Sequence, residues 1–295
     1  MSIFREQRGS VTLLVASAMV VLLGFAALVV DIGFVYWTRA QLVTEADSAA
    51  LAGAGELPIS SSQAEATART YAASNGQPGD SFSSVMGNGN TSLTVQVSRT
   101  VDLLFARVFG HTTQNVTATA TATVSAVGSA DHVVPFGVVR QDFQFGRTVT
   151  LRVGGGDGTT GNFGALALGG NGSRNYVDNI KEGYEGTLSV GQWITTETGN
   201  MAGPTETGVD YRISQDPSAT YDTAGKDSPR IIVVPVLDSL TVNGRNEVLI
   251  VGFATFFLEG ATKGEVSGKF MQTFSGNTTP GNGVSYGYYN VRLTQ

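Results

Sequence analysis

The sequence has no cysteine and only two histidines, His111 and His132, among its 295 residues. The absence of cysteine excludes disulfides, thiolate metal ligands and cysteine nucleophiles. Two histidines are too few for most histidine-built metal sites, and neither stands in a recognisable ligand spacing, so we expect both at the surface. We therefore predict no cofactor, no metal site and no catalytic residues.

Charged residues are also scarce, at 14% of the chain against about 25% in ordinary soluble domains. The formal net charge is −6, and the basic residues form no dense patch. Because a nucleic-acid surface needs such a patch to neutralise phosphates, we predict no nucleic-acid partner. Glycine is abundant, with 38 residues, which favours a turn-rich and strand-rich body over a helical one.

A long run near the amino terminus lacks any charge. Val11–Val30 contains twenty residues and no charged side chain, and as a helix it would span about 30 Å, the thickness of a bilayer's hydrocarbon core. Asp31 stands one residue past the run. We expect Asp31 at the outer edge of the span, where water and lipid headgroups solvate it. The alternative is a pairing with a cationic group on a neighbouring subunit's helix.

Aromatic and basic residues flank this run and set its orientation. An aromatic belt typical of the membrane interface follows the run and consists of Phe34, Tyr36 and Trp37. Arg5 and Arg8 precede the run and predict a cytoplasmic amino terminus, although Arg39 on the other side weakens the asymmetry. We thus predict a single-pass protein of the inner (cytoplasmic) membrane, with the lipid bilayer as its first partner and its later domains extracytoplasmic.

A removable secretory signal is the competing interpretation of the same run. The apolar core of a signal is about 7 to 15 residues long and is closely followed by small residues at the cleavage site. Here the core is longer, and the nearest small-residue pattern, AALAGAGE at 49–56, lies well beyond the aromatic belt. We therefore favour a retained anchor, with residues 1–10 in the cytoplasm and residues 11–37 forming the span and its belt.

Helix-forming residues continue past the belt through residues 38–54. Small or apolar residues recur there at the three-to-four spacing of one helix face, namely Leu42, Ala46, Ala49, Ala50 and Gly53. We predict one continuous helix that leaves the bilayer and ends near Gly55 and Pro58. The small residues permit close approach of a partner helix, or they pack the helix against its own domain. Both interpretations stay open.

Behind the anchor, residues 38–127 predict a small pilin-like α+β module. SSQAEATARTYAASNG predicts a second helix at 61–75, with Ser62 and Glu65 as a capping box and Gly76 at its end. Its glycine content predicts a loop at 76–90. Alternation of apolar and polar residues predicts strands at 92–101 and 114–127, with a short helix between them at 102–110.

Residues 132–295 change to strands separated by glycine-rich turns, which predicts a mainly-β domain, either a sandwich or a barrel, and an α+β protein as a whole. The predicted strands are 133–139, 147–153, 164–168, 186–196, 209–213, 230–240, 247–260, 265–274 and 284–293. The apolar stretch 248–258 is too short for a second helical span, so we predict a core strand buried on both faces. A single GGGDGTTGN at 154–162 predicts a hairpin loop rather than a calcium site.

Three motifs stand in order at the amino terminus. They are an RGS start, the segment LGFAALVVDIG and the helix RAQLVTEADSAALAGA. Further along, LLFARVFG is followed by VTATATATV. Together these motifs resemble the TadE/TadG-like members of the Tad/Flp pilus-assembly family, over about residues 8–125. The resemblance does not extend to the β-rich remainder.

This resemblance implies a non-catalytic, membrane-anchored component of a pilus-assembly system, acting as a minor pilin-like subunit or as an assembly or anchoring factor. It also implies that the amino-terminal helix packs against other Tad/Flp components. The candidates for contact with the membrane or with such partners are Arg8, Gly9, Asp31, Tyr36, Trp37 and Arg39. Prepilin peptidase substrates carry a glycine before the cut and a glutamate five residues later. Here Gly9 is followed at that distance by Leu14, which favours an unprocessed anchored form.

Two other functions compete with this interpretation. A surface adhesin or ligand-binding protein would work through residues 132–295 and would bind a surface ligand there. An exported hydrolase tethered to the membrane would have to recruit one of the two histidines without the support of any motif.

Overall fold

A computed structural model describes residues 8–57, 59–153, 162–240, 245–276 and 278–294. The chain forms two compact units. The first contains the residues up to Thr123 together with the last residues from Arg292, and the second contains Val124–Val291. The end of the chain therefore returns to the amino-terminal unit, which the sequence did not indicate.

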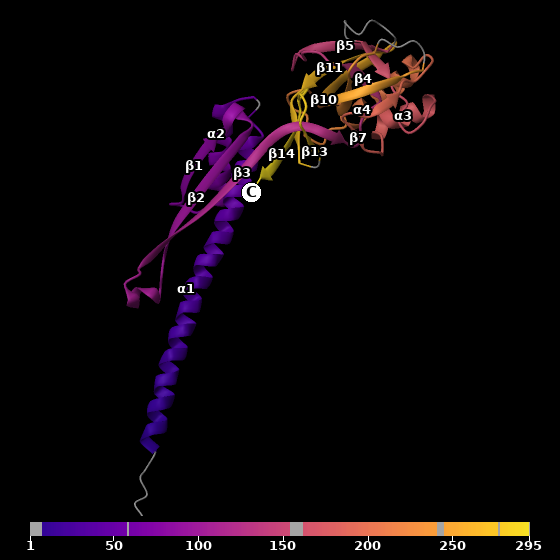
Figure 1. Cartoon of the computed structure of the whole chain (residues 1–295). Helices are drawn as coiled ribbons and strands as arrows, with labels where there is room; N and C mark the ends of the chain where they lie inside the picture. The colour runs from indigo at the N-terminus through magenta and orange to yellow at the C-terminus, as the bar shows by residue number, and fades with distance from the viewer. Residues whose placement is uncertain (1–7, 58, 154–161, 241–244, 277, 295) are drawn as a thin grey trace, which may run out of the picture. The chain divides into compact units, whose positions relative to one another are not determined.

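The first unit is built on one long helix, α1 (Arg8–Ala54), drawn in indigo in Figure 1. Its 47 residues run without interruption, which confirms the predicted continuous helix, and they correspond to a length of about 70 Å. The helix divides by burial into an exposed half, residues 11–37, and a packed half, residues 38–54. Large apolar side chains are exposed throughout the first, whereas the second is buried along one face.

The second helix, α2 (Ser61–Asn75), packs against the packed half of α1. Its fully buried residues are all alanines: Ala64, Ala68 and Ala72. Gly76 ends the helix as predicted. The predicted cap at Ser62 is wrong by two residues, because the side chain of Ser60 accepts the hydrogen bond from the Gln63 amide at 3.2 Å.

Part of a sheet packs against the helices of the first unit. Its strands are β1 (Ser81–Met86), β2 (Ser92–Asp102), β3 (Thr113–Ala130) and β14 (Tyr288–Thr294), in the order β1-β2-β3-β14. On β2, alternate residues from Leu93 to Val97 are buried, and this strand packs on α1. The interval 76–90, predicted as a loop, contains β1 and the short 3₁₀ helix η1 (Asn88–Asn90). This edge strand escaped prediction because none of its side chains is fully buried.

The β2–β3 hairpin ends in a tip that contains the 3₁₀ helix η2 (Ala106–Phe109). Gly110 follows it with a left-handed backbone at φ 86°, which glycine adopts without steric cost. The predicted short helix at 102–110 is thus present, over fewer residues than expected. β2 and β3 pair antiparallel from Ser92↔Thr123 to Asp102↔Thr113, so the tip lies at the end of a continuous ladder.

The second unit is built around a closed ring of six strands, β4 (Phe136–Val139), β5 (Thr148–Val153), β6 (Asn162–Ala165), β9 (Ile231–Leu237), β10 (Glu247–Thr262) and β11 (Glu265–Met271). The order is β11-β5-β6-β4-β9-β10, and β10 pairs again with β11. This closure identifies a barrel rather than a sandwich. Within β10 every residue from Gly252 to Leu258 is buried, which confirms the predicted doubly buried strand.

Short strands complete the two sheets. They are β7 (Leu188–Ser189), β8 (Trp193–Thr195), β12 (Thr273–Ser275) and β13 (Thr279–Gly281). β8 pairs with the start of β10, and β12 pairs parallel with β14. β7 and β13 pair with the last residues of β3. The predicted hairpin at 154–162 falls almost entirely outside the described residues.

Two helices in the second unit correct the expectation of strands alone. They are α3 (Ser173–Glu182) and α4 (Ala202–Gln215), and α4 contains residues 209–213, which were wrongly predicted as a strand. Apolar and polar residues alternate in this segment, which is the pattern typical of a half-buried strand. The face of α4 that is buried includes polar Thr205 and Arg212, and the guanidinium of Arg212 donates to backbone carbonyl oxygens. Because polar residues form part of this face, apolar periodicity did not reveal the helix.

Candidate membrane-anchoring and packing site

The exposed half of α1 presents an uninterrupted apolar surface. Leucine, valine and phenylalanine side chains from Val11 to Val30 are about half to three quarters exposed, and Asp31 is the only buried residue between 11 and 37. Exposing so much apolar surface to water is unfavourable. The helix is long and apolar enough to cross a membrane once. Its length, composition and exposure together indicate a single-pass membrane protein.

Asp31 is bound by the tip of the β2–β3 hairpin. Its carboxylate accepts hydrogen bonds from the backbone amides of Leu104 at 2.8 Å, Phe105 at 3.0 Å and Ala106 at 2.7 Å. These amides lead into η2, and the first amides of a helix lack partners within the helix itself. The side chain is 5% exposed. The acid and the amides therefore satisfy each other.

This arrangement corrects the expectation that Asp31 is solvated. The carboxylate is buried against the hairpin tip rather than solvated by water and headgroups, and a pairing with a cation of a neighbouring subunit stays a prediction. Its partners lie 73 to 75 residues further along the chain. A contact over that separation leaves no local signal in the sequence.

The other candidate residues lie at three places on α1. Tyr36 and Arg39 line an open cavity of about 390 Å³ beside Asp31, together with apolar side chains of α1 and the hairpin tip. Trp37 is half exposed, and its ring stacks on Phe34 with 6.0 Å between the ring centroids. The remaining two candidates, Arg8 and Gly9, stand in the first turn of α1. The structure therefore brings Asp31, Tyr36 and Arg39 together at one groove.

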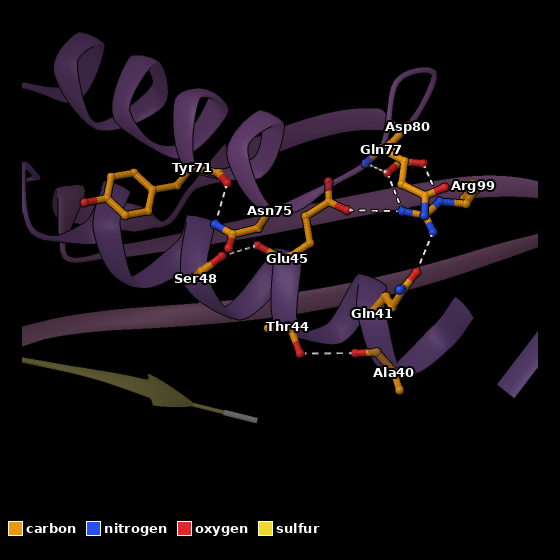
Figure 2. Close-up of polar contacts among 10 residues, drawn as sticks. All are labelled: Ala40, Gln41, Thr44, Glu45, Ser48, Tyr71, Asn75, Gln77, Asp80 and Arg99. Atoms are coloured by element: carbon orange, nitrogen blue, oxygen red, sulfur yellow. Dashed lines mark hydrogen bonds and ion pairs between the residues drawn. The ribbon is translucent and has the colours of Figure 1, made fainter. Parts of the chain in front are cut away.

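A polar cluster fixes the packed half of α1 to the sheet and to the segment after α2 (Figure 2). Arg99 on β2 binds Asp80 through two parallel hydrogen bonds, from Nε at 2.7 Å and from Nη2 at 2.6 Å. Its Nη1 donates to Oε1 of Gln41 on α1 at 2.9 Å. The Asp80 carboxylate also accepts a hydrogen bond from the backbone amide of Gln77 at 2.6 Å. Paired, charge-assisted bonds of this kind are stronger than neutral ones and geometrically specific.

Glu45 is the member of this cluster whose buried carboxylate is incompletely hydrogen-bonded. It lies on α1 with only 2% of its surface exposed, and its Oε2 is 4.0 Å from Nη2 of Arg99. Among the described residues this oxygen has no hydrogen-bond partner. Burial, and then the nearby Asp80 carboxylate, raise the pKa of Glu45 to about 7, while Arg99 acts in the opposite direction. The hydrogen bond from Arg99 lowers the pKa of Asp80 below its ordinary value.

The sequence analysis did not single out Glu45, Asp80 or Arg99. One signal was available, since Glu45 falls on the same helix face as Leu42 and Ala49, which were predicted to be buried. A charge on such a face requires a partner from another element. No local pattern identifies Arg99 as that partner, because a charged residue in an alternating strand usually faces solvent.

The structure also bears on metal binding and on the two histidines. Within the described ranges, no group of three or more histidine, aspartate or glutamate side chains could hold a metal ion. His111 and His132 are both exposed, as predicted.

The amino-terminal helix carries the feature that relates this chain to known proteins. Residues 9–56 match the family described as Tad, putative Flp pilus-assembly TadE/G-like. The match confirms the resemblance in this region and covers α1 from its second residue, Gly9, together with the two residues after the helix. The LLFARVFG and VTATATATV motifs lie outside the matched residues, so their part of the resemblance stays a prediction. No curated protein and no solved structure matches the chain.

Proposed function

We propose that this chain is a non-catalytic, single-pass component of a Tad/Flp pilus-assembly system, acting as a minor pilin-like subunit or as an assembly or anchoring factor. The match of residues 9–56 to the TadE/G-like family carries this proposal. The matched segment coincides with the helix whose exposed half contains one buried residue between 11 and 37, Asp31, which binds the hairpin tip.

The two halves of α1 support different parts of this function. The exposed half, with residues such as Leu22 and Val20 about two-thirds exposed, offers its surface to lipid and to the spans of other pilus components. The packed half ties the same rigid helix to the α+β module. A force or a displacement applied to the span is thus transmitted directly to the module, as an anchoring factor requires.

Orientation and processing complete the proposal. Arg5 and Arg8 place the amino terminus in the cytoplasm of an inner-membrane protein and the later residues outside it. Because Leu14 stands where prepilin peptidase substrates have glutamate, the span is retained without cleavage after Gly9. The intact mass of the protein purified from native membranes should therefore include residues 1–30. A mature chain that begins at Ser10 would instead identify a processed pilin, and one that begins beyond Trp37 would remove the anchor altogether.

Pilus assembly in the native host tests the function itself. Deletion of the gene should reduce the number of surface pili, and the wild-type gene supplied in trans should restore it. A photoreactive residue at Leu22 in the exposed half should crosslink to components of the pilus system identified by mass spectrometry. The same residue at Tyr71, which is exposed on α2, should not. Normal pilus numbers in the deletion strain would refute the proposal.

A further inference from the structure

The tip of the β2–β3 hairpin has an unusually apolar surface. Four large apolar side chains project from it, and their exposed fractions are 65% for Leu104, 45% for Phe105, 85% for Val108 and 79% for Phe109. All four lie within six consecutive residues. Contiguous exposed apolar surface on a small segment marks a contact with another apolar phase or molecule. Nothing in the anchoring role of α1 accounts for it.

The position of the tip identifies that phase. The amides of residues 104–106 bind Asp31 directly, and Asp31 is the first residue after the uncharged run of α1. Figure 1 shows the tip of the β2–β3 hairpin beside the middle of α1. The tip is therefore level with the end of the apolar span, where the hydrocarbon core of a bilayer gives way to the headgroups.

Apolar side chains of the tip and of α1 meet at one cavity. Leu28, Ile32 and Val35 of α1 line the same open cavity as Leu103 and Ala106 of the tip. Asp31, Arg39 and Gln114 line the cavity as well, so the apolar side chains of the span and of the tip meet beside polar groups of the kind found at the headgroup level.

We propose that the hairpin tip is a second membrane contact, in which Leu104, Phe105, Val108 and Phe109 enter the leaflet next to the packed half of α1. This inference rests on the membrane span and is independent of the role in pilus assembly. The lipid bilayer is the occupant because the apolar side chains of the tip meet those of the span at one cavity beside Asp31.

The polar groups of the tip fit this placement. Backbone amides outside a regular helix cannot enter an apolar phase without partners, and the Asp31 carboxylate supplies an acceptor for three of them. Arg107 is half exposed among the four apolar residues and lies 3.4 Å from Asp102. An arginine at this depth can extend its guanidinium to the headgroup phosphates while its apolar stem stays with the lipid.

Site-directed spin labelling of the full-length protein in lipid bilayers tests the inference. Because the chain has no cysteine, one introduced cysteine gives one labelled position. The three variants are Val20→Cys in the span, Val108→Cys at the tip and Val85→Cys on β1. All three valines are exposed, at 70%, 85% and 68%, so labelling should not disturb the fold. Val85 pairs with Thr94, eight residues before the tip end of β2, which places it well away from the tip.

Collision of each label with oxygen and with a water-soluble nickel complex reports its depth in the bilayer. The ratio of oxygen to nickel accessibility at Val108 should be several-fold higher than at Val85 and should approach the ratio at Val20. A Val108 label as open to nickel as the Val85 label would overturn the inference. A Val108 label shielded from both reagents and dipolar-coupled to a second label would show that another copy of the chain covers the tip, and would overturn it as well. If the Val20 label is itself open to nickel, the span fails, and the inference falls with it.

Discussion

The two halves of α1 share one uninterrupted helix but have opposite surroundings. In the exposed half the apolar residues are large, and they project away from the protein. In the packed half the buried face is made mostly of small residues, with Ala46, Ala49 and Ala50 completely buried, although it also contains Leu42 and Glu45. Side-chain size therefore decides what surrounds each half. Large apolar residues present the most surface to lipid, whereas small ones let a second helix approach closely.

The glycines of α1 show the same difference. A Cβ atom added at Gly24 or Gly33 would meet nothing within 4 Å. A Cβ at Gly53 would stand 2.5 Å from Cδ2 of Leu93 and 2.7 Å from the carbonyl oxygen of Ala64. The stripe of small residues thus packs the helix on its own domain, and of the two interpretations left open by the sequence this is the one observed.

Replacing Asp31 should produce the largest effect, because it removes the polar attachment of the exposed half to the rest of the first unit. A hydrogen bond to a charged group contributes about 1.5–3 kcal/mol. Asp31→Asn keeps the shape of the side chain but loses the charge and one acceptor oxygen. The opening free energy of the tip should fall by about 3 kcal/mol, and amides 104–106 should exchange with deuterium roughly a hundredfold faster.

Asp102→Asn is the matched control for Asp31→Asn. Asp102 lies at the base of the same tip, its side chain is 73% exposed, and its ion pair with Arg107 is open to solvent. Exposed pairs of this kind contribute about 1 kcal/mol or less. Exchange of amides 104–106 should therefore stay close to wild type. Equal exchange rates in the two variants would show that the Asp31 carboxylate does not hold the tip.

One substitution placed in each half tests the comparison directly. Gly53→Leu forces a large side chain between α1, α2 and β2, and overpacking of this kind costs about 1–3 kcal/mol or more. Gly33→Leu adds the same side chain where space is open, and leucine favours a helix over glycine by somewhat less than about 1 kcal/mol. Denaturant unfolding in lipid nanodiscs, followed by circular dichroism, should show a less stable Gly53→Leu variant and an unchanged or slightly more stable Gly33→Leu variant. A similar loss in both would contradict the division of α1 into two halves.

Local sequence patterns were enough to predict both halves of α1. They did not predict the hydrogen bonds that join each half to the rest of the first unit. The uncharged run and the stripe from Leu42 to Gly53 are periodic signals within a few turns of helix. The bonds from Asp31 to the hairpin tip and from Arg99 to Asp80 and Gln41 join segments far apart in the sequence, and no periodicity encodes such a pairing. In the second unit, alternation gave most of the strands. It did not show that β11 and β10, the two ends of the strand order β11-β5-β6-β4-β9-β10, pair with each other and so close a barrel.

Glu45 in the packed half should make the free energy of unfolding depend on pH. This effect is smaller than that of replacing Asp31 and is seen only at certain pH values. The pKa of Glu45 is raised from 4.5 to about 7 in the folded chain, so between these values the folded state holds a proton that the unfolded state releases. Stability should therefore fall as the pH rises through this window, by about 2–3 kcal/mol in all. Glu45→Gln removes this loss. The variant should resemble wild type near pH 4.5 and exceed its stability by about 2–3 kcal/mol at pH 8.

Glu65→Gln provides the control, because Glu65 is exposed on α2 and forms a surface ion pair with Arg69 at 3.3 Å. Its unfolding curves should follow wild type at every pH to within about 1 kcal/mol. Asp80 does not obscure the result. Its pKa is lowered by Arg99, so its contribution is present at neutral pH and is lost only as the pH falls below the ordinary range of aspartate. If Glu45→Gln destabilises the protein equally at pH 4.5 and pH 8, then Glu45 is ionised throughout and its attraction to Arg99 outweighs its burial.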